Sequence, residues 1–219
     1  MLVLAVDTSG KNGSIALAQC GSPDRCEIVE VVPLEGGTFS AQLVPQIAAL
    51  LSKQGFTKLD IAGFAVASGP GSFTGLRVGL AAIKALAEVL NKPIAVVSLL
   101  EALAANKKGK VRAALDAGRS EIYVADYDGG HATSAELLLK REELFGSSAD
   151  IAIVTPDNDL AEMAGQQGLQ VEHVSRPRSD TIARLGWRKI LAGETVSPEA
   201  LDANYVRRSD AEIFAKGET

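Results

Sequence analysis

The run from Ser68 to Gly79, SGPGSFTGLRVG, constrains the fold of this chain more than any other feature. It joins an apolar, strand-like stretch at 61–67 to a long helical pattern at 74–90. Between the two, Gly69-Pro70-Gly71 is typical of a tight turn in which side chains would clash. The run therefore predicts a strand, a sharp turn and a helix in direct succession.

Two glycines inside the predicted helix call for a close neighbour. Ser72 or Thr74 can cap the helix by accepting backbone N–H bonds. Past the cap, Gly75 and Gly79 lie one turn apart on the same helical face. A glycine in a helix interior is about 1 kcal/mol less favourable than alanine. We therefore expect a packed helix, a backbone segment or a ligand to approach that face very closely.

The spacing of the glycines differs from both common nucleotide-binding loops. A Walker loop needs a lysine where the phosphates would lie, and this run has none there. A dinucleotide fingerprint needs a third glycine where Thr74 stands. The pattern favours close-packing glycines over a phosphate loop, and we assign Gly69, Gly71, Gly75 and Gly79 to that role.

Four stretches of the sequence resemble the TsaB family, a non-catalytic partner in bacterial tRNA threonylcarbamoyladenosine synthesis, in the group once labelled M22 glycoprotease-like. The glycine run is the most specific of the four. The others are LAVDTS at 4–9, DAGRSEIY at 116–123 and LDANYVR at 201–207. Two positions depart from the family pattern: Phe39 stands where many relatives carry histidine, and Ala203-Asn204 lacks the usual proline before the tyrosine.

The resemblance implies an α/β, two-lobed fold of the actin, Hsp70 and sugar-kinase type. It implies a scaffold subunit that does no chemistry alone and that binds a TsaD-like catalytic transferase and a TsaE-like ATPase. Contact with tRNA would be indirect, through the complex. No cofactor is implied for the chain itself, apart from weak nucleotide binding at a subunit interface. When alone, the chain is expected to form a homodimer.

Two apolar helices are expected to supply the surface for the partner. Helix 40–53 has an apolar face, and helix 74–90 is apolar nearly all round, so its second side needs a cover. In the family these two helices pack on the catalytic subunit as a helical bundle. The predicted interface residues are Leu43, Ile47, Leu50, Leu51, Phe73, Leu76, Leu80 and Ile83.

The order of the predicted elements agrees with such a fold. Three β-rich runs at 2–7, 14–20 and 26–32 are separated by turns short enough for hairpins, and alternating helices and strands follow. We expect a first lobe at 1–106 and a smaller second lobe at 107–195, closed by a helix at 180–191. The tail at 196–219 is expected to pack back on the first lobe.

Charge, hydropathy and cysteine content restrict the partners and the compartment. The net charge of −5 gives no footprint for independent binding to nucleic acid. No apolar run is long enough to span a membrane, and the first residues do not resemble a signal peptide, so we expect a cytoplasmic protein. Cys20 and Cys26 flank a short turn and could lie within bridging distance, but in a reducing compartment free thiols are expected.

The sequence offers little equipment for catalysis. Asp7-Thr8-Ser9 lies where actin-fold proteins hold phosphates, but the same residues form an Asx turn without any ligand. We interpret them as a vestigial phosphate site at most. His131 and His173 have no partner at metal-binding spacing, and Ser72 lacks a nucleophile elbow. The alternatives are a small actin-fold kinase or ATPase using Asp7 and Thr8, an M22-type peptidase, and a homodimer with an unrelated role.

Overall fold

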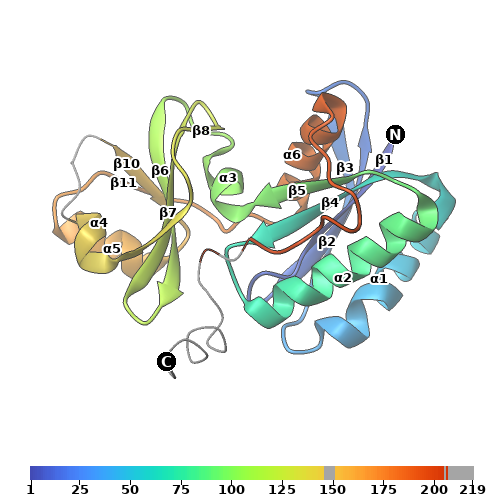
Figure 1. The fold of residues 1–219 in the computed structure, drawn as a ribbon, viewed down its shortest axis with the longest axis horizontal. Coiled ribbons are helices and arrows are strands. Elements are labelled where there is room, and N and C mark those ends of the chain that lie inside the picture. Colours follow the sequence, from blue (N-terminus) through green and yellow to red (C-terminus); the bar gives the residue numbers. More distant parts are fainter. Residues whose placement is uncertain (146–150, 205, 207–219) are drawn as a thin grey trace, which may run out of the picture. The chain divides into compact units, whose positions relative to one another are not determined.

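The structure is a computed structural model that describes residues 1–145, 151–204 and 206 of the 219. The chain divides into two compact units (Figure 1). Unit 1 contains residues 1–98 and 177–203, and unit 2 contains 99–176 and 204–219, of which 204 and 206 are described after 176. Each unit is built around one mixed β-sheet.

Unit 1 contains a five-stranded sheet in the order β3-β2-β1-β4-β5. The three N-terminal strands form antiparallel hairpins, as predicted, whereas β4 and β5 run parallel to β1. This order confirms the predicted actin-like lobe. The strands are β1 (Leu2–Asp7), β2 (Gly13–Cys20), β3 (Cys26–Leu34), β4 (Ile61–Gly69) and β5 (Ile94–Ser98).

Three helices cover the two faces of this sheet, and the short 3-10 helix η1 (Lys58–Asp60) precedes β4. The helices are α1 (Phe39–Lys53), α2 (Phe73–Leu90) and α6 (Ser179–Ala192). Large side chains such as Leu4 and Val6 share one core cluster with residues of α1 and α2. The intervening positions of the strands carry small residues, and α6 packs on this face (Figure 1). Alternation of large and small residues along the strands therefore separates the helices into two layers.

The small-residue face allows α6 to lie very close to the sheet. A Cβ added to Gly186 would lie 2.3 Å from the Cβ of Ala65 and 3.6 Å from that of Ala95. Trp187 follows directly and is 1% exposed. The backbone of α6 thus rests on alanine side chains. Any larger residue at position 186 would force the helix away from the sheet.

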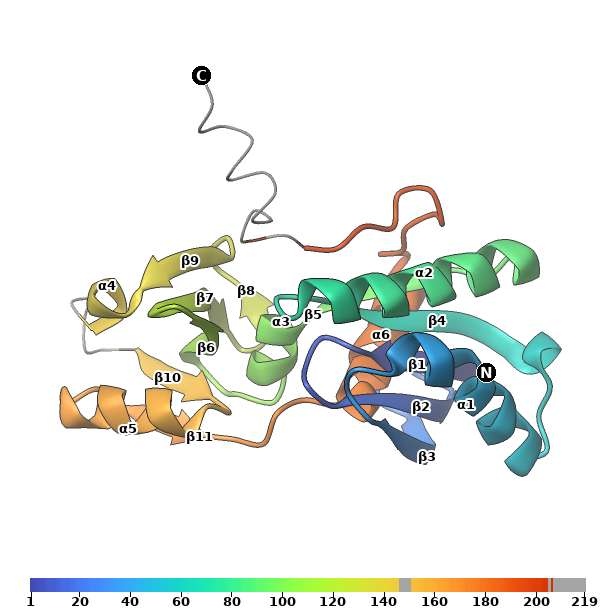
Figure 2. The same cartoon turned by 90° about the horizontal axis from the view of Figure 1, so that it is seen from below.

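Unit 2 is built around a six-stranded sheet in the order β11-β10-β6-β7-β8, with β9 paired to β7. Helices α4 and α5 contribute to its core cluster, and α3 packs on β6 and β7 (Figure 2). The strands are β6 (Lys110–Gly118), β7 (Glu121–Asp128), β8 (His131–Ala132), β9 (Leu137–Lys140), β10 (Ala152–Thr155) and β11 (Val171–His173). The helices are α3 (Leu99–Ala104), α4 (Arg141–Phe145) and α5 (Asn158–Gln166).

The division of the chain differs from the predicted lobes at both boundaries. The first change of unit falls at 98/99 rather than at 106/107, because α3 packs on β6 and β7 of unit 2. The helix predicted to close the second lobe is α6, which packs on β1, β2, β4 and β5 of unit 1. The tail residues 196–203 also belong to unit 1, where Val196 bridges Ile94. Of the rest of the predicted tail, residues 204 and 206 belong to unit 2, and residues 205 and 207–219 lie outside the described residues.

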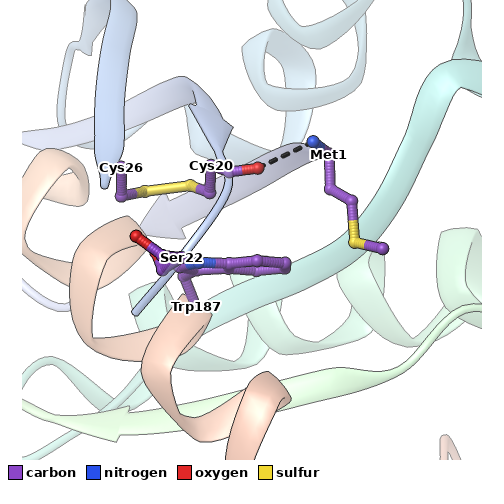
Figure 3. The surroundings of a disulfide bond; sticks show 5 residues. All are labelled: Met1, Cys20, Ser22, Cys26 and Trp187. Carbon is purple, nitrogen blue, oxygen red and sulfur yellow. Dashed lines mark hydrogen bonds between the residues drawn. A yellow bond between two sulfur atoms is a disulfide. The ribbon is translucent and has the colours of Figure 1, made fainter. Parts of the chain in front are cut away.

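The two cysteines are bonded, which contradicts the prediction of free thiols. Cys20 and Cys26 face each other in the β2–β3 ladder, with their Cα atoms 3.9 Å apart. Figure 3 shows the disulfide beside Met1 and above the ring of Trp187. The prediction followed from an assumed reducing compartment, whereas the pairing follows from the register of the hairpin.

Candidate functional site

The acidic turn after β1 is closed on itself. One carboxylate oxygen of Asp7, Oδ1, accepts hydrogen bonds from the backbone N–H of Ser9 at 2.9 Å and from its hydroxyl at 2.5 Å. Asp7 is 4% exposed, Thr8 2% and Ser9 1%. This is the Asx turn that the sequence offers as the alternative to a phosphate site.

The glycine run covers that turn with the beginning of α2. A Cβ added to Gly75 would lie 2.1 Å from the carbonyl oxygen of Thr8, and one added to Gly71 would lie 2.4 Å from that of Ser9. A Cβ at Gly79 would lie 2.4 Å from Thr8 Oγ1. Three of the four predicted close-packing glycines therefore approach the β1–β2 loop.

Local backbone chemistry fixes this arrangement. The backbone N–H of Ser72 donates to the carbonyl oxygen of Ser9 at 2.7 Å. The hydroxyl of Ser72 accepts from the N–H of Gly75 at 3.3 Å, so Ser72 rather than Thr74 is the N-cap of α2. Gly69 ends β4 with φ of 111°, a conformation that favours glycine. The beginning of α2 therefore covers the β1–β2 loop at Thr8 and Ser9.

Most of the predicted interface residues are buried inside unit 1, so the prediction that they contact a partner is wrong for them. Seven of the eight are at most 7% exposed and belong to the core cluster of unit 1, and Phe73 alone is half-buried. The seven are Leu43, Ile47, Leu50, Leu51, Leu76, Leu80 and Ile83. Their apolar faces are directed to the sheet and to the neighbouring helix because both helices lie on the same sheet face.

The outer side of α1 and α2 nevertheless has an apolar groove of about 450 Å³. Its lining is formed by Ser40, Leu43, Val44, Phe73, Thr74, Arg77, Val78, Ala81 and Ala82, a set we call the α1–α2 groove. Val44 is 53% exposed. The guanidinium of Arg77 lies 3.7 Å from the centre of the Phe73 ring and places a charge at the edge of this surface. Apolar walls with one cationic edge suit an amphipathic helix better than a small polar substrate.

A second hollow, of about 760 Å³, lies where α1 and α2 begin. It borders the β1–β2 loop, and its polar side chains are those of Lys11, Asn12, Glu35, Ser40, Ser72 and Thr74. Among the residues described, no three His, Cys, Asp or Glu side chains come together as metal ligands. Over the same residues, no helix combines the length and apolar character that a membrane crossing requires.

An ionic contact ties α1 to the edge strand β3. Glu30 accepts hydrogen bonds from Lys53 Nζ at 2.5 Å and from Gln54 Nε2 at 2.6 Å. Both bonds favour the ionised form, so the pKa of Glu30 is lowered from its ordinary value of 4.5, chiefly by Lys53. This contact ties the C-terminal end of α1 to β3, at the opposite end of the helix from the groove residues Ser40, Leu43 and Val44.

Sequence reasoning missed the outward-facing residues of the groove. Val44, Ala81 and Ala82 are small or medium-sized apolar residues, and they lie between the buried positions of their helices. A signal was present: apolar residues that remain after the core stripe of a helix is assigned are candidates for a second contact.

Comparison with known proteins agrees with the fold and the motifs. The family model described as TsaD, tRNA N6-adenosine threonylcarbamoyltransferase, matches residues 31–178. The tRNA threonylcarbamoyladenosine biosynthesis protein TsaB of Bacillus subtilis is 35% identical over 58% of this chain and 55% of its own length. The protein of the same name from Escherichia coli is 28% identical over 96% of both chains.

Solved structures give the same result. A crystal structure of an uncharacterized Pseudomonas aeruginosa protein with similarity to peptidase YEAZ matches with a TM-score of 0.77 and 26% identity. That match covers 94% of this chain and 99% of the other. YeaZ from Pseudomonas aeruginosa matches with a TM-score of 0.74 and 25% identity, over 93% and 99% of the two chains. The chain belongs to the family of the TsaD model and, within it, to the TsaB (YeaZ) group.

Proposed function

We propose that this chain is a non-catalytic subunit in tRNA threonylcarbamoyladenosine synthesis, where it holds a TsaD-like transferase in a productive arrangement. The observation that carries the proposal is a contrast between two surfaces of unit 1. The acidic turn at Asp7 is closed by α2, whereas the α1–α2 groove is open and apolar. A buried acidic turn that bonds to itself, beside an open apolar groove between two helices, is suited to binding a protein rather than to transferring a group.

The groove suits a partner that presents helices. Its outer residues Val44, Ala81 and Ala82 are small enough for another helix to approach closely, as in bundle packing. We therefore propose that helices of the transferase subunit pack across α1 and α2, and that a TsaE-like ATPase joins the same complex. In this arrangement tRNA contacts the complex chiefly through the other subunits.

The binding proposal is tested by placing a charge in the groove without touching the core. Ala81→Glu, at an exposed position, should prevent formation of the complex with a TsaD-like subunit, measured by size-exclusion chromatography with light scattering. Val89→Glu is a matched control on the same helix, because Val89 is 77% exposed and lies outside the groove. A complex that withstands Ala81→Glu as well as it withstands Val89→Glu would refute this interface.

The functional proposal is tested by reconstitution of tRNA modification from purified subunits. We expect threonylcarbamoyladenosine formation, measured by nucleoside analysis, to need this chain, and to be lost with Ala81→Glu. The chain incubated alone with tRNA and substrates should form none. Equal product with and without the chain would contradict a scaffold role.

We also propose that the groove pairs two copies of the chain when no transferase is present. An apolar surface of this kind seeks cover, and a symmetric pair provides it. Ala81→Glu should then convert the isolated protein to a monomer in light scattering. A dimer that persists in this variant would place the self-contact elsewhere.

For nucleotides, we propose that the isolated chain binds Mg-ATP weakly at most, and that any site in the complex is shared between subunits. The reason is that Asp7 is buried and its carboxylate already accepts two hydrogen bonds from Ser9, so it does not face a metal-bound phosphate. Calorimetry with Mg-ATP on the isolated chain should show no micromolar binding. Tight binding with turnover would favour the kinase or ATPase alternative.

A further inference from the structure

The end of the β2–β3 hairpin is a junction of three parts of unit 1. The amino group of Met1 donates to the carbonyl oxygen of Cys20 at 2.7 Å. The indole N–H of Trp187, in α6, donates to the carbonyl oxygen of Ser22 at 3.1 Å (Figure 3). The disulfide between Cys20 and Cys26 therefore closes a loop that is hydrogen-bonded both to the N-terminus before β1 and to α6.

The loop has its own hydrogen bonds, so opening the disulfide need not open the hairpin. Cys20 and Cys26 form the last rung of a ladder that extends back to Gly13 and Leu34. Within the turn, the N–H of Gly21 donates to Arg25 O at 2.7 Å. The ladder and the turn would hold two reduced thiols side by side, where they can form the bond again without refolding.

The two sulfur-bearing residues differ in access. Cys20 is 3% exposed, whereas Cys26 is half-buried and begins the edge strand β3. An external thiolate can therefore approach Cys26 more readily than Cys20. A reductant can reach Cys26, and the ladder keeps the Cys20 thiol next to it. A disulfide buried in a core lacks the first of these features.

We propose that Cys20 and Cys26 are a reversible dithiol–disulfide pair that sets how firmly α6 is held on the hairpin. A thiolate of a dithiol reductant attacks Sγ of Cys26, and the S–S bond breaks with its electron pair on Cys20 Sγ, which takes up a proton. The second thiolate of the reductant then attacks the mixed disulfide, forms the reductant's own disulfide and releases Cys26 as a thiol. Two electrons pass to the protein, and glutathione disulfide reverses the sequence through the same exchange.

The reduced and oxidised states should differ at Trp187. With the covalent closure broken, only the hydrogen bonds of the ladder and the turn hold the Ser22 carbonyl, and its hydrogen bond to the indole opens more often. The exchange of the Trp187 indole proton is a specific probe, because the chain contains one tryptophan. Amide protons at the C-terminal end of α6 should follow it, whereas those of α2 should not.

The test uses the full chain treated with dithiothreitol or with glutathione disulfide, without denaturant. Maleimide labelling followed by mass measurement should add two labels to the reduced protein and none to the reoxidised protein. NMR should show faster indole exchange at Trp187 in the reduced state. The variant with Cys20→Ser and Cys26→Ser should behave as the reduced protein and ignore both reagents. A pair that dithiothreitol cannot open in the folded protein, or equal Trp187 exchange in both states, would overturn the proposal.

Discussion

Replacing Gly75 with alanine tests the claim that α2 lies against the backbone of the β1–β2 loop. The new Cβ would lie 2.1 Å from the carbonyl oxygen of Thr8, well below the 3.4 Å at which ordinary contact begins. The obstacle is a main-chain oxygen, so no change of side-chain rotamer can relieve the clash. To relieve the clash, the helix or the loop must move by about 1 Å in a region that is almost fully buried.

Two opposing terms set the magnitude of this change. Gly75 is the third residue of α2, so alanine there should stabilise the helix by at most about 1 kcal/mol, the value for a helix interior. Overpacking a buried site costs typically 1–3 kcal/mol, occasionally more, and the shortfall in distance here points to the upper part of that range. We expect a net loss of about 2 kcal/mol, which lowers the melting temperature by roughly 4–8 °C in a chain of this length.

Circular dichroism at 222 nm with thermal and urea unfolding measures the effect. Gly165→Ala in α5 is the matched control, because a Cβ there meets nothing within 4 Å, and this variant should be neutral or more stable. Gly79→Ala adds a second test. Its Cβ would meet the side-chain Oγ1 of Thr8 at 2.4 Å, so Thr8→Ala should rescue Gly79→Ala but not Gly75→Ala. A Gly75→Ala protein as stable as the Gly165→Ala control would refute the close approach.

Three further predictions concern contacts outside the glycine run. Gly186→Ala should loosen α6 from the sheet and lower the urea midpoint followed by tryptophan fluorescence, and Ala65→Gly should partly restore it, because the two Cβ atoms would be 2.3 Å apart. The pKa of the Glu30 carboxylate is lowered in the folded protein, so its stabilising contribution is present above pH 4.5 and is lost as pH falls through the folded-state pKa. Glu30→Gln should therefore flatten that part of the curve of unfolding free energy against pH. Asp126→Asn should cost unit 2 about 1.5–3 kcal/mol, measured by hydrogen exchange in β6 and β7, because Arg112 donates to both of its carboxylate oxygens and is mostly buried. Unchanged exchange in that variant would show that the pair adds nothing to the sheet.

Much of the fold could be predicted because local signals and long-range pairing agree. The hairpins of the first three strands follow from short turns between β-rich runs, and the pairing of β1 with β2 and of β2 with β3 confirms them. The strand, turn and helix of the glycine run are present as β4 and α2. In unit 2, β8, β9 and α4 were missed because they are short and carry weak periodicity.

The placement of α6 could not be predicted from its position in the chain. It follows the last strand of unit 2 in sequence, and proximity in sequence favours the same lobe. The information that decides its place is distributed: Gly186 matches the alanine positions Ala65 and Ala95, which lie more than ninety residues away. Complementarity between a small-residue helix face and a small-residue sheet face is visible once both are known, but neither alone identifies the other.

The candidate interface was misassigned for a related reason. Apolar residues nearly all round α2 were interpreted as one surface for a foreign partner, whereas the sheet, α1 and the segment 196–203 each take a share of them. Leu201 and Ala203 belong to the same core cluster as Leu80 and Ile83. The apolar excess of α2 is therefore largely accounted for inside unit 1.

What remains for a partner is a narrow surface of small side chains, and this changes how the interface should respond to substitution. Truncating Val44 to alanine removes little apolar area, so binding should weaken only modestly. A carboxylate at Ala81 instead forces a longer, charged side chain between two helices, and its desolvation costs more than the lost contact even with Arg77 one turn away. Substitution of Leu80 or Ile83, which are 7% and 0% exposed, would disrupt unit 1 before it could report on binding. Introducing a charge in the groove, rather than removing a large side chain, is therefore the change that weakens binding without destabilising unit 1.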